Sequence, residues 1–590
     1  MITSALSFSV AFSGSAVVYA QNESGSTEPE TIIEDPPPAD ELPPAPMGEI
    51  AELQGAPMAL SLREVVITTL AQNLGIEIQA QDQEIAAEAV LQAWGIYDPV
   101  LGATGQLRRT DQQTGTFLPG ASDQVVSYQD EQDAEVSLSQ RTPLGTNLEI
   151  FAREEYTNRL SPPLSFGPVV EPEYRETVGL RVTQPLLKNF GPLVTNAQIR
   201  VSKKEAEQAD WSFRREVENR VSDVMKAYWD LDFALRNAEV QRQALESAEE
   251  LRRVNQKNFD VGRLPRLSVY QAEAQVAQRE SLLADAEAQV IAAQDRLWAL
   301  MNWDRANLAA TWDRPIQPTD RPSYDQELKL LDQELVNVAL DLRPDHQAVI
   351  LGKDIAQINH DVARRQRLPE LNAVAGYNFT GVDDNRRDSL STVEGRDFTG
   401  YYVGLEFRYP LFNREARGAY RQSQERLQQT ELTIQSSELG ITQEVRAATR
   451  DVRTALKQIV ATTRQVRADI EKLEAEQKRL SVGERTVFDV LDFQDDLALS
   501  RANQARALAD YQKALIELGR STGVLLMLQG VEIENPEPVS GTEGLFTTDD
   551  PEAQIRTLDI LEWNQLLKEG KIRNPSPEES EAAEETETTE

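Results

Sequence analysis

The sequence contains no cysteine and only two histidines among its 590 residues. The absence of cysteine excludes disulfide bonds, thiolate metal sites and a lipid-modified N-terminal cysteine. Apart from a segment at the N-terminus, no stretch approaches about 18 apolar residues, so a helical membrane span is not expected. Basic residues are too few to balance the acidic ones, 60 against 97, and the net charge of -37 argues against a nucleic-acid partner.

The two ends of the chain are predicted to lie outside its folded part. Ile2 to Ala20 is a short apolar run that ends in small residues, so we interpret residues 1–20 as a signal peptide. The run has no preceding Lys or Arg, which leaves open a different start or a disordered leader. Residues 21–58, rich in proline and acidic residues, predict a disordered tether. Residues 528–590 predict an acidic, largely disordered tail, in which Glu552 to Lys571 could form an amphipathic helix.

The most informative feature of the sequence is an internal duplication. Pro185-Leu186 corresponds to Pro410-Leu411, and Val261-Gly262 corresponds to Val482-Gly483. In each copy an alternating, strand-like run ends at the Pro-Leu pair, a long helical pattern follows, and the chain reverses at the Gly. These landmarks divide the chain into repeat 1 at 59–302, a connector at 303–342 and repeat 2 at 343–527.

The helical patterns keep the apolar 4-3 spacing of a coiled-coil seam. The seam residues are Val217, Val221, Val224, Tyr228, Leu231, Leu235 and Ala238 in the first copy, and Ile441, Val445, Ala448, Val452, Ala455, Ile459, Thr462 and Val466 in the second. The outgoing helices would each extend about 100 Å, which suits a tube or a shaft and not a globular core. The returning helices are shorter, so a further helix from each copy is expected to stack on them. The expected helices are Ser61–Trp94, Asn196–Asn258, Leu264–Met301, Pro344–Arg367, Asn413–Leu480 and Thr486–Met527, with tips near 260–268 and 481–489.

Strand-like runs of period two lie between the helices, at about 99–186 and about 370–410. In Gly400 to Tyr409 aromatic and apolar residues occupy every second position, and Leu371 to Thr380 is the expected partner strand. Strands of about ten residues match the hydrocarbon core of a membrane. One chain has too few strands to close a barrel, so several chains must pool them.

The strand region of the first copy is longer than that of the second and contains an additional apparent hairpin. Its strands are Glu135 to Gln140 and Asn147 to Glu154, around the turn TPLGTN. This hairpin could enlarge the barrel or form an extracellular flap, and both alternatives remain open at the level of sequence.

The order of helix, strand hairpin, long helix, VG tip and returning helix, written twice, together with the segment VGERTVFDVLDFQ, resembles the TolC-like outer-membrane efflux family, also called outer membrane factors. The resemblance covers about Leu60 to Leu526. It implies a mainly α fold with a transmembrane β part: long coiled-coil helical hairpins form a periplasmic α-barrel, and strand hairpins form a shared trimeric outer-membrane β-barrel of twelve strands, four from each chain.

The same resemblance implies a function. A homotrimer embedded in outer-membrane lipid would be the passive exit duct of a tripartite efflux or type I secretion system. Its partners would be a periplasmic adaptor, also called a membrane fusion protein, and an inner-membrane transporter. No cofactor and no catalytic activity are expected.

Two acidic residues beside the second tip are candidates for a pore entrance. Asp489 and Asp492 are spaced by three and therefore lie on one face of a helix. In a three-fold assembly each would repeat as a ring of carboxylates, which concentrates cations and can bind a multivalent one. The positions match the acidic rings of the family. The alternative is the ordinary preference for Asp in the first turn of a helix.

Further residues at the tips are assigned through the resemblance alone. Arg485 matches the arginine that holds the entrance of the family closed. The position of that arginine's acidic partner is occupied by Ser268, so either another carboxylate such as Asp260 pairs with Arg485 or the gate is looser. The residues that match the adaptor-docking tips are Val261, Gly262, Val482 and Gly483.

No constellation of catalytic or metal-binding residues is found. His346 and His360 are far apart on one expected helix and are interpreted as surface histidines. The segment Gly519 to Gly523 matches GxSxG but lies at a helix end, so we interpret the match as chance. Carboxylate pairs such as Asp495-Asp496 are interpreted as solvated helix faces. A non-membrane periplasmic coiled-coil scaffold or adaptor is the alternative function, although the alternating strands favour the duct.

Overall fold

The computed structural model describes residues 57–114, 125–160, 172–303, 312–325, 328, 330–482, 484, 487–531 and 533. The chain divides into two compact units, Met1–Glu537 and Pro538–Glu590, and all described residues lie in the first. The predicted signal peptide, nearly all of the predicted tether and tail, and the amphipathic helix expected at Glu552 to Lys571 therefore fall outside the described residues.

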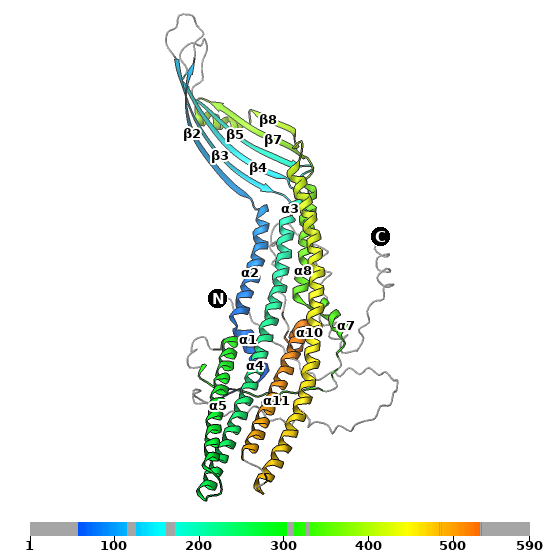
Figure 1. Ribbon diagram of the computed structural model, residues 1–590. Helices are drawn as coiled ribbons and strands as arrows, with labels where there is room; N and C mark the ends of the chain where they lie inside the picture. Colours follow the sequence, from blue (N-terminus) through cyan, green and yellow to red (C-terminus); the bar gives the residue numbers. More distant parts are fainter. Residues whose placement is uncertain are drawn as a thin grey trace, which may run out of the picture. The chain divides into compact units, whose positions relative to one another are not determined.

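Two long helical hairpins dominate the first unit (Figure 1). In the first hairpin α4 (Ala197–Asp260) returns as α5 (Arg266–Met301), and in the second α10 (Arg414–Ser481) returns as α11 (Val487–Thr522). α4 has 64 residues and α10 has 68, so each spans about 100 Å at about 1.5 Å per residue. The bounds predicted for the two outgoing helices are confirmed to within two residues.

The predicted coiled-coil seam is the core of these hairpins. Every seam residue from Val217 to Ala238 is no more than 3% exposed, and those from Ile441 to Ile459 are no more than 5% exposed. Burial of an unbroken apolar stripe is what holds two helices of this length together. None of the described helices is both long enough and apolar enough to cross a membrane.

The segment before the first strand forms two helices and not the single helix predicted at Ser61–Trp94. α1 spans Leu62–Gln72 and α2 spans Leu74–Trp94. Asn73 between them has an extended backbone, and its side-chain oxygen accepts hydrogen bonds from two backbone N–H groups of α2 at 2.8 and 3.3 Å. Such local bonds compete with helix continuation, so the helix stops and restarts at Asn73.

Each returning helix is extended by a second, shorter helix, as predicted. The side-chain nitrogen of Asn73 donates to the carbonyl oxygen of Leu300 at the end of α5 (2.7 Å), so α2 continues along α4 beyond α5. In the second copy α8 (Pro344–Arg365) continues along α10 beyond α11. Gly523, after α11, has φ +73°, and a Cβ there would lie 3.1 Å from the backbone of Arg343, so a side chain at this junction would be strained.

Smaller elements complete the helical part. The predicted connector contains α7 (Asp332–Leu342), which sequence patterns did not indicate, and α12 (Leu525–Leu528) follows α11. β1 (Met58–Leu60) pairs in parallel with β6 (Ile316–Pro318), and this pair joins the start of repeat 1 to the connector.

The remaining strands form one antiparallel sheet at the end of the helical hairpins that is opposite their tips (Figure 1). The strands, in both spatial and chain order, are β2 (Val100–Thr114), β3 (Val125–Arg141), β4 (Asn147–Leu160), β5 (Glu173–Pro185), β7 (Glu370–Asp383) and β8 (Thr399–Arg408). The additional hairpin of the first copy is therefore part of the sheet, which has six strands instead of the four expected from the family. A short helix, α9 (Arg386–Gly395), which was not predicted, connects β7 to β8.

One face of this sheet is apolar and exposed. A single register row runs across all six strands and contains Leu101, Leu138, Ile150, Leu180, Tyr377 and Tyr401. Each of these side chains is at least 42% exposed. The neighbouring row on the other face contains Val100, Ser139, Glu149, Arg181, Gly376 and Tyr402. The alternation predicted from the sequence thus makes one face apolar, whereas the other face is mixed and carries the charged side chains.

Candidate functional site: the helical tips and the polar contacts above them

The first tip is a tight reversal between α4 and α5. Val261, directly after α4, is 67% exposed, and Gly262 has φ +74°, a conformation that glycine adopts without strain. The backbone N–H of Arg263 donates to the carbonyl oxygen of Asn258 (2.8 Å) and closes the turn. The tip therefore presents an apolar side chain and bare backbone to its surroundings.

The second tip repeats this geometry. Val482 follows α10 and is 70% exposed. The N–H of Glu484 donates to the carbonyl oxygen of Arg479 (3.1 Å), a bond across the same number of residues as at the first tip. Gly483 and Arg485 lie outside the described residues. The correspondence between the two tips in sequence is accompanied by a correspondence in hydrogen bonding.

The predicted acidic residues lie at the start of α11. Asp489 is in its first turn and partly buried, and Asp492 is in the next turn and exposed. On the opposite tip Asp260 is the last residue of α4 and accepts a hydrogen bond from the side chain of Gln256 (2.7 Å). Asp260 therefore has a partner within its own helix.

A polar contact between the two hairpins lies just above the tips, and we call Gln275, Arg279 and Asp495 the tip latch. Arg279 of α5 forms an ion pair with Asp495 of α11, and the amide nitrogen of Gln275 lies 3.0 and 2.9 Å from the two carboxylate oxygens. The Arg279 side chain is only 7% exposed, and burial lowers the pKa of its guanidinium. Breaking this pair would leave a buried charge without its partner, so the contact holds the two hairpins together at this level.

The interpretation of Asp495-Asp496 as a solvated helix face is therefore wrong for Asp495. Asp496 is exposed, as predicted, whereas the side chain of Asp495 is directed at the neighbouring hairpin. Adjacent helical residues point about 100° apart, so one can face solvent while the other faces α5.

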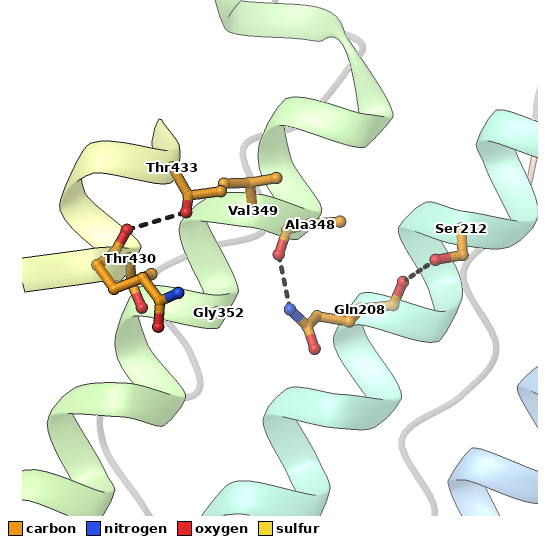
Figure 2. A pocket seen from close by; sticks show the side chains of 8 residues that line it. Gln208, Ser212, Ala348, Val349, Gly352, Thr430 and Thr433 are labelled. Carbon is orange, nitrogen blue, oxygen red and sulfur yellow. Dashed lines mark hydrogen bonds between the residues drawn. The ribbon is translucent and has the colours of Figure 1, made fainter. Parts of the chain in front are cut away.

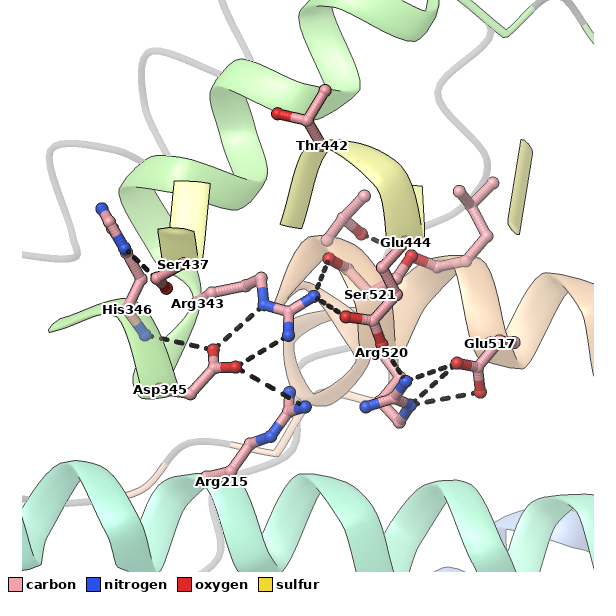
Figure 3. A network of polar contacts seen from close by, with 12 residues as sticks. Arg215, Arg343, Asp345, His346, Ser437, Thr442, Glu444, Glu517, Arg520 and Ser521 are labelled. Atoms are coloured by element: carbon pink, nitrogen blue, oxygen red, sulfur yellow. Dashed lines mark hydrogen bonds and ion pairs between the residues drawn. The ribbon is translucent and has the colours of Figure 1, made fainter. Parts of the chain in front are cut away.

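A second, larger polar network lies where the start of α8 meets the end of α11 (Figure 3). Arg343 is 3% exposed and donates to both oxygens of Asp345, at 3.0 and 2.7 Å, and to Glu444 of α10 at 2.6 Å. Arg520 of α11 pairs with Glu444 and also with Glu517. The network bonds α8, α10 and α11 to one another.

α4 is joined to α11 by two ion pairs on the tip side of this network. Lys226 of α4 donates to Glu517 (2.5 Å), and Lys513 of α11 donates to Asp230 of α4 (2.9 Å). Burial opposes ionisation of Glu517, but hydrogen bonds from Arg520 and Lys226 prevail and lower its pKa to about 2. The first and second copies are thus held together by charged contacts and by the apolar seams.

Glu218 is a carboxyl group of α4 whose ionisation the surroundings oppose. It follows Val217 in the seam of α4, and its side chain is 1% exposed. Burial raises its pKa to about 7, although Arg215, whose guanidinium lies 3.6 Å away, works in the other direction. Glu218 therefore changes its charge near neutral pH.

The candidate chemistry weighed from the sequence is not assembled. His346 is 5% exposed, with Nδ1 3.4 Å from the hydroxyl of Ser437, so its interpretation as a surface histidine is wrong. His360 is partly buried, and its Nδ1 lies 3.1 Å from the hydroxyl of Ser423. The part of the chain that the structure describes contains no group of three or more potential metal ligands. In the GxSxG match, Ser521 accepts a hydrogen bond from Arg343 through its backbone oxygen (3.1 Å) and lies within a helix.

A shallow groove on the helical wall offers no alternative active site (Figure 2). It lies between α4, α8 and α10, and Gln208 donates across it to the carbonyl oxygen of Ala348 (2.7 Å). Its lining residues are Gln208, Ser212, Ala348, Val349, Gly352, Gln429, Thr430 and Thr433. None of them is charged, so the groove contains no acid, base or nucleophile pair.

Sequence reasoning missed the tip latch and the network around Arg343. The only signal for Glu218 is a charged residue directly beside an apolar seam position, and for Arg343 a charged residue directly before the Pro that begins a helix. No such signal exists for Arg279, because one basic residue on a mixed helix face is ordinary.

Solved structures of outer-membrane channels share this fold. The Campylobacter jejuni CmeC outer membrane channel matches with a TM-score of 0.57 at 17% identity, over 79% of this chain and 86% of CmeC. The open state of the Neisseria gonorrhoeae MtrE outer membrane channel matches with a TM-score of 0.54 at 16% identity, over 82% of this chain and 97% of MtrE. The predicted fold class is confirmed: long helical hairpins joined to a strand sheet, with internal duplication.

Sequence comparison gives the same result. Outer membrane protein TolC of Vibrio cholerae is 23% identical over 214 residues, and this chain spans about half of the relative's length, 46%. The family model described as "Outer membrane efflux protein" matches residues 170–302 and 335–524. The family and the structural relatives are channels and not enzymes, and they place the chain in the outer membrane with its helical part in the periplasm. This chain belongs to the outer membrane efflux protein family.

Proposed function

We propose that three copies of this chain form the passive exit duct of a tripartite efflux or type I secretion system. The duct would receive substrates from a periplasmic adaptor and an inner-membrane transporter and conduct them unchanged to the exterior. The observation that carries this proposal is the joining, within one unit, of an apolar-faced sheet to helices of about 100 Å. A sheet of this kind belongs in a bilayer, and helices of this length can reach far into the periplasm.

Assembly of several copies is supported by the two edges of the unit. α2 lies on one side of α4, and α8 and α10 lie on the other (Figure 1). Both outer helices keep apolar side chains in the open: Ile78 and Ile85 of α2 are at least 62% exposed, and Leu432 and Leu439 of α10 are at least 64% exposed. A head-to-tail contact between α2 of one copy and α10 of the next would bury both stripes and close a ring.

The tips are the proposed entrance and docking surface. Val261, Gly262, Val482 and Gly483 would form the adaptor contact, since the exposed valine side chains at both tips and the open backbone at Gly262 suit helix-to-helix docking. Arg485 would act as the gate arginine. The tip latch would hold the second hairpin against the first in the closed state, and its release would let the tips separate.

Asp489 and Asp492 would form the acidic rings of the entrance. Their position in the first two turns of α11, next to the second tip, is consistent with a constriction at the periplasmic end. Three copies of each carboxylate would raise the local concentration of cations and provide oxygen ligands for a multivalent cation.

Recordings from the purified protein in planar lipid bilayers test this proposal. The wild type is expected to open pores that prefer cations, and millimolar multivalent cations added to the tip side are expected to block them. The double variant Asp489→Ala, Asp492→Ala should lose most of this block, whereas Asp496→Ala, a neighbouring carboxylate outside the proposed rings, should retain it. Unchanged block in the double variant would remove the ring assignment, and absence of any pore would remove the duct.

The scaffold alternative considered from the sequence lacks a specific observation in its favour. Membership of the outer membrane efflux protein family and the apolar sheet face both oppose it. Fractionation separates the two functions, because a periplasmic scaffold would be released by high salt or alkali, whereas the duct should require detergent.

A further inference from the structure

We propose that this chain gives six strands to the shared barrel, so that three copies close an eighteen-stranded barrel through contacts between β2 of one copy and β8 of the next. The proposal rests on the proposed duct function and specifies how the copies meet in the membrane. The sequence left open whether the additional hairpin joins the barrel or forms a flap, and the following observations favour the barrel.

The strands β2 and β3 share the lipid-facing surface of the other four. Leu101 of β2 and Leu138 of β3 lie in the same register row as Tyr377 of β7 and Tyr401 of β8. Beyond that row Leu107 is 81% exposed and Val136 is 53% exposed. An extracellular flap would expose these side chains to water, whereas a barrel strand places them in lipid.

The apolar stripe is also staggered in the way that a closed barrel requires. It covers Leu101 to Leu107 on β2 and Tyr401 to Phe407 on β8, while Leu101 and Tyr401 share one row. From the shared row the stripe extends away from the helices on β2 and toward the helices on β8. Its centre is position 104 on β2 and position 404 on β8, and the rows of these two centres are six residues apart along the strands. With about 3.4 Å per residue and about 4.8 Å per strand step, this shift corresponds to a strand tilt of about 40°.

That tilt has a consequence for β2 and β3. Membrane barrels tilt their strands by about 35–45°, so a level hydrocarbon band crosses successive strands at successively shifted residues. The apolar stripe follows this slope from β8 through to β2. The residues of β2 and of β3, the first strand of the additional hairpin, are therefore placed at the depth that the same membrane band demands.

The base of the additional hairpin is built into the rest of the chain. In the turn between β3 and β4, Gly145 has φ +89°, and a Cβ there would lie 2.7 Å from the backbone oxygen of Asn189. The N–H of Gly191, directly before the α3 turn (Pro192–Thr195), donates to the carbonyl oxygen of Leu144 (3.2 Å). The turn is thus packed against the junction between β5 and α4, which fixes β3 and β4 in the sheet.

The two free edges are suited to each other. Among the residues that the structure describes, β2 and β8 each pair with a strand on one side only. An even number of alternating strands makes β8 antiparallel to β2 of a neighbouring copy, as the ladder around a barrel requires. Unpaired backbone groups at these edges cannot remain open in lipid, so a second copy must cover them.

The apolar stripes on β2 and β8 also predict which residues lie opposite each other where two copies meet. Their centres, position 104 on β2 and position 404 on β8, should lie at nearly the same depth. Since lipid-facing residues must oppose each other, Val403 is expected opposite Gly105 or one of its lipid-facing neighbours. The resulting barrel would be about 1.5 times as wide as one of twelve strands, because diameter grows roughly in proportion to strand number.

Disulfide trapping tests this arrangement, and the natural absence of cysteine makes the chain a clean background. Val403→Cys is combined in turn with cysteines at Leu101, Ala103, Gly105 and Leu107, all exposed positions on β2, to cover neighbouring registers. The matched control combines it with Ala152→Cys on β4, an exposed alanine that would lie at the edge if β2 and β3 formed a flap. Isolated membranes are oxidised and analysed by denaturing gel.

At least one β2 cysteine is expected to give a ladder that ends at three copies, while the β4 cysteine and each single variant give monomer. A ladder from the β4 cysteine instead would show that β2 and β3 lie outside the barrel. The eighteen-stranded arrangement would also be overturned by a ladder that ends at two copies, or by the absence of a ladder from an assembly that is trimeric in detergent. In each of these cases the duct function would stand. A water-soluble protein that never enters the membrane fraction would refute the duct itself.

Discussion

Replacing Asp495 by asparagine removes one charge from the tip latch and leaves the size of the side chain almost unchanged. The variant disrupts the ion pair with Arg279, whose side chain is 7% exposed, and weakens the bonds from Gln275. Hydrogen bonds to charged groups contribute about 1.5–3 kcal/mol. Asp495 itself is 39% exposed, so solvent screening favours the lower end, about 1.5–2 kcal/mol per copy.

If the latch stabilises the closed tips, this free energy is lost from the closed state alone. A loss of about 1.5–2 kcal/mol corresponds to a factor of about 10 to 30 for each copy, so release of all three latches together would raise the ratio of open to closed channels by about 10³- to 10⁴-fold. The measurement is the open probability of single channels in planar bilayers at fixed voltage. Arg279→Met should have a similar effect, and the double variant should open no more often than either single variant, because both substitutions break one contact.

The neighbouring substitution Asp496→Asn is the matched control, since it removes the same charge from an exposed side chain on the same helix. It should leave the open probability close to that of the wild type. Equal opening in Asp496→Asn would mean that net charge and not the latch controls the tips. An unchanged open probability in Asp495→Asn would show that the contact with Arg279 is structural only.

Two further predictions concern the helical network and the sheet. Because burial raises the pKa of Glu218 from 4.5 to about 7, its ionisation destabilises the folded state by about 3 kcal/mol above pH 7, and this cost disappears as the pH falls toward 4.5. Glu218→Gln should therefore raise the thermal unfolding midpoint in detergent relative to the wild type at about pH 8, and should raise it much less at about pH 5. An increase in the midpoint that is independent of pH would show that the buried charge is not its cause. Ala103→Lys, on the apolar face of β2, should cost about 2–4 kcal/mol of folded-state stability in membranes. Its neighbour Thr104→Lys, on the polar face, should cost little, and equal yields of the two folded variants in the outer membrane would place β2 outside the bilayer.

Periodicity in the sequence was sufficient to locate the long helices and their buried face. The seam through Val221 and Tyr228, and its counterpart through Val445 and Ile459, is fully buried because a 4-3 spacing leaves no other way to cover the apolar stripe. Strict alternation in Gly400 to Tyr409 similarly located β8 to within one residue. These features are local, and the physics that produces them acts over a few turns or one strand.

Features that depend on a single side chain or on contacts between distant segments were not predictable in this way. Asn73 divides a helix because its side chain caps the next one, although the apolar pattern continues across it. Asp495 faces a partner on the neighbouring hairpin and Asp496 faces solvent because of where α5 lies, and nothing within α11 records that position. His346 is buried for the same reason, against Ser437 of a helix that is 91 residues away in the chain.

Native mass spectrometry of the protein, extracted from outer membranes in detergent, tests most directly whether identical chains share one membrane pore. Three copies are expected in a single particle that dissociates only when the detergent micelle or the fold is destroyed. A stable monomer that stays in solution when detergent is removed would contradict the account. The apolar row from Leu101 to Tyr401 would then have no lipid to cover it, and the edge strands β2 and β8 would have no neighbouring copy to pair with.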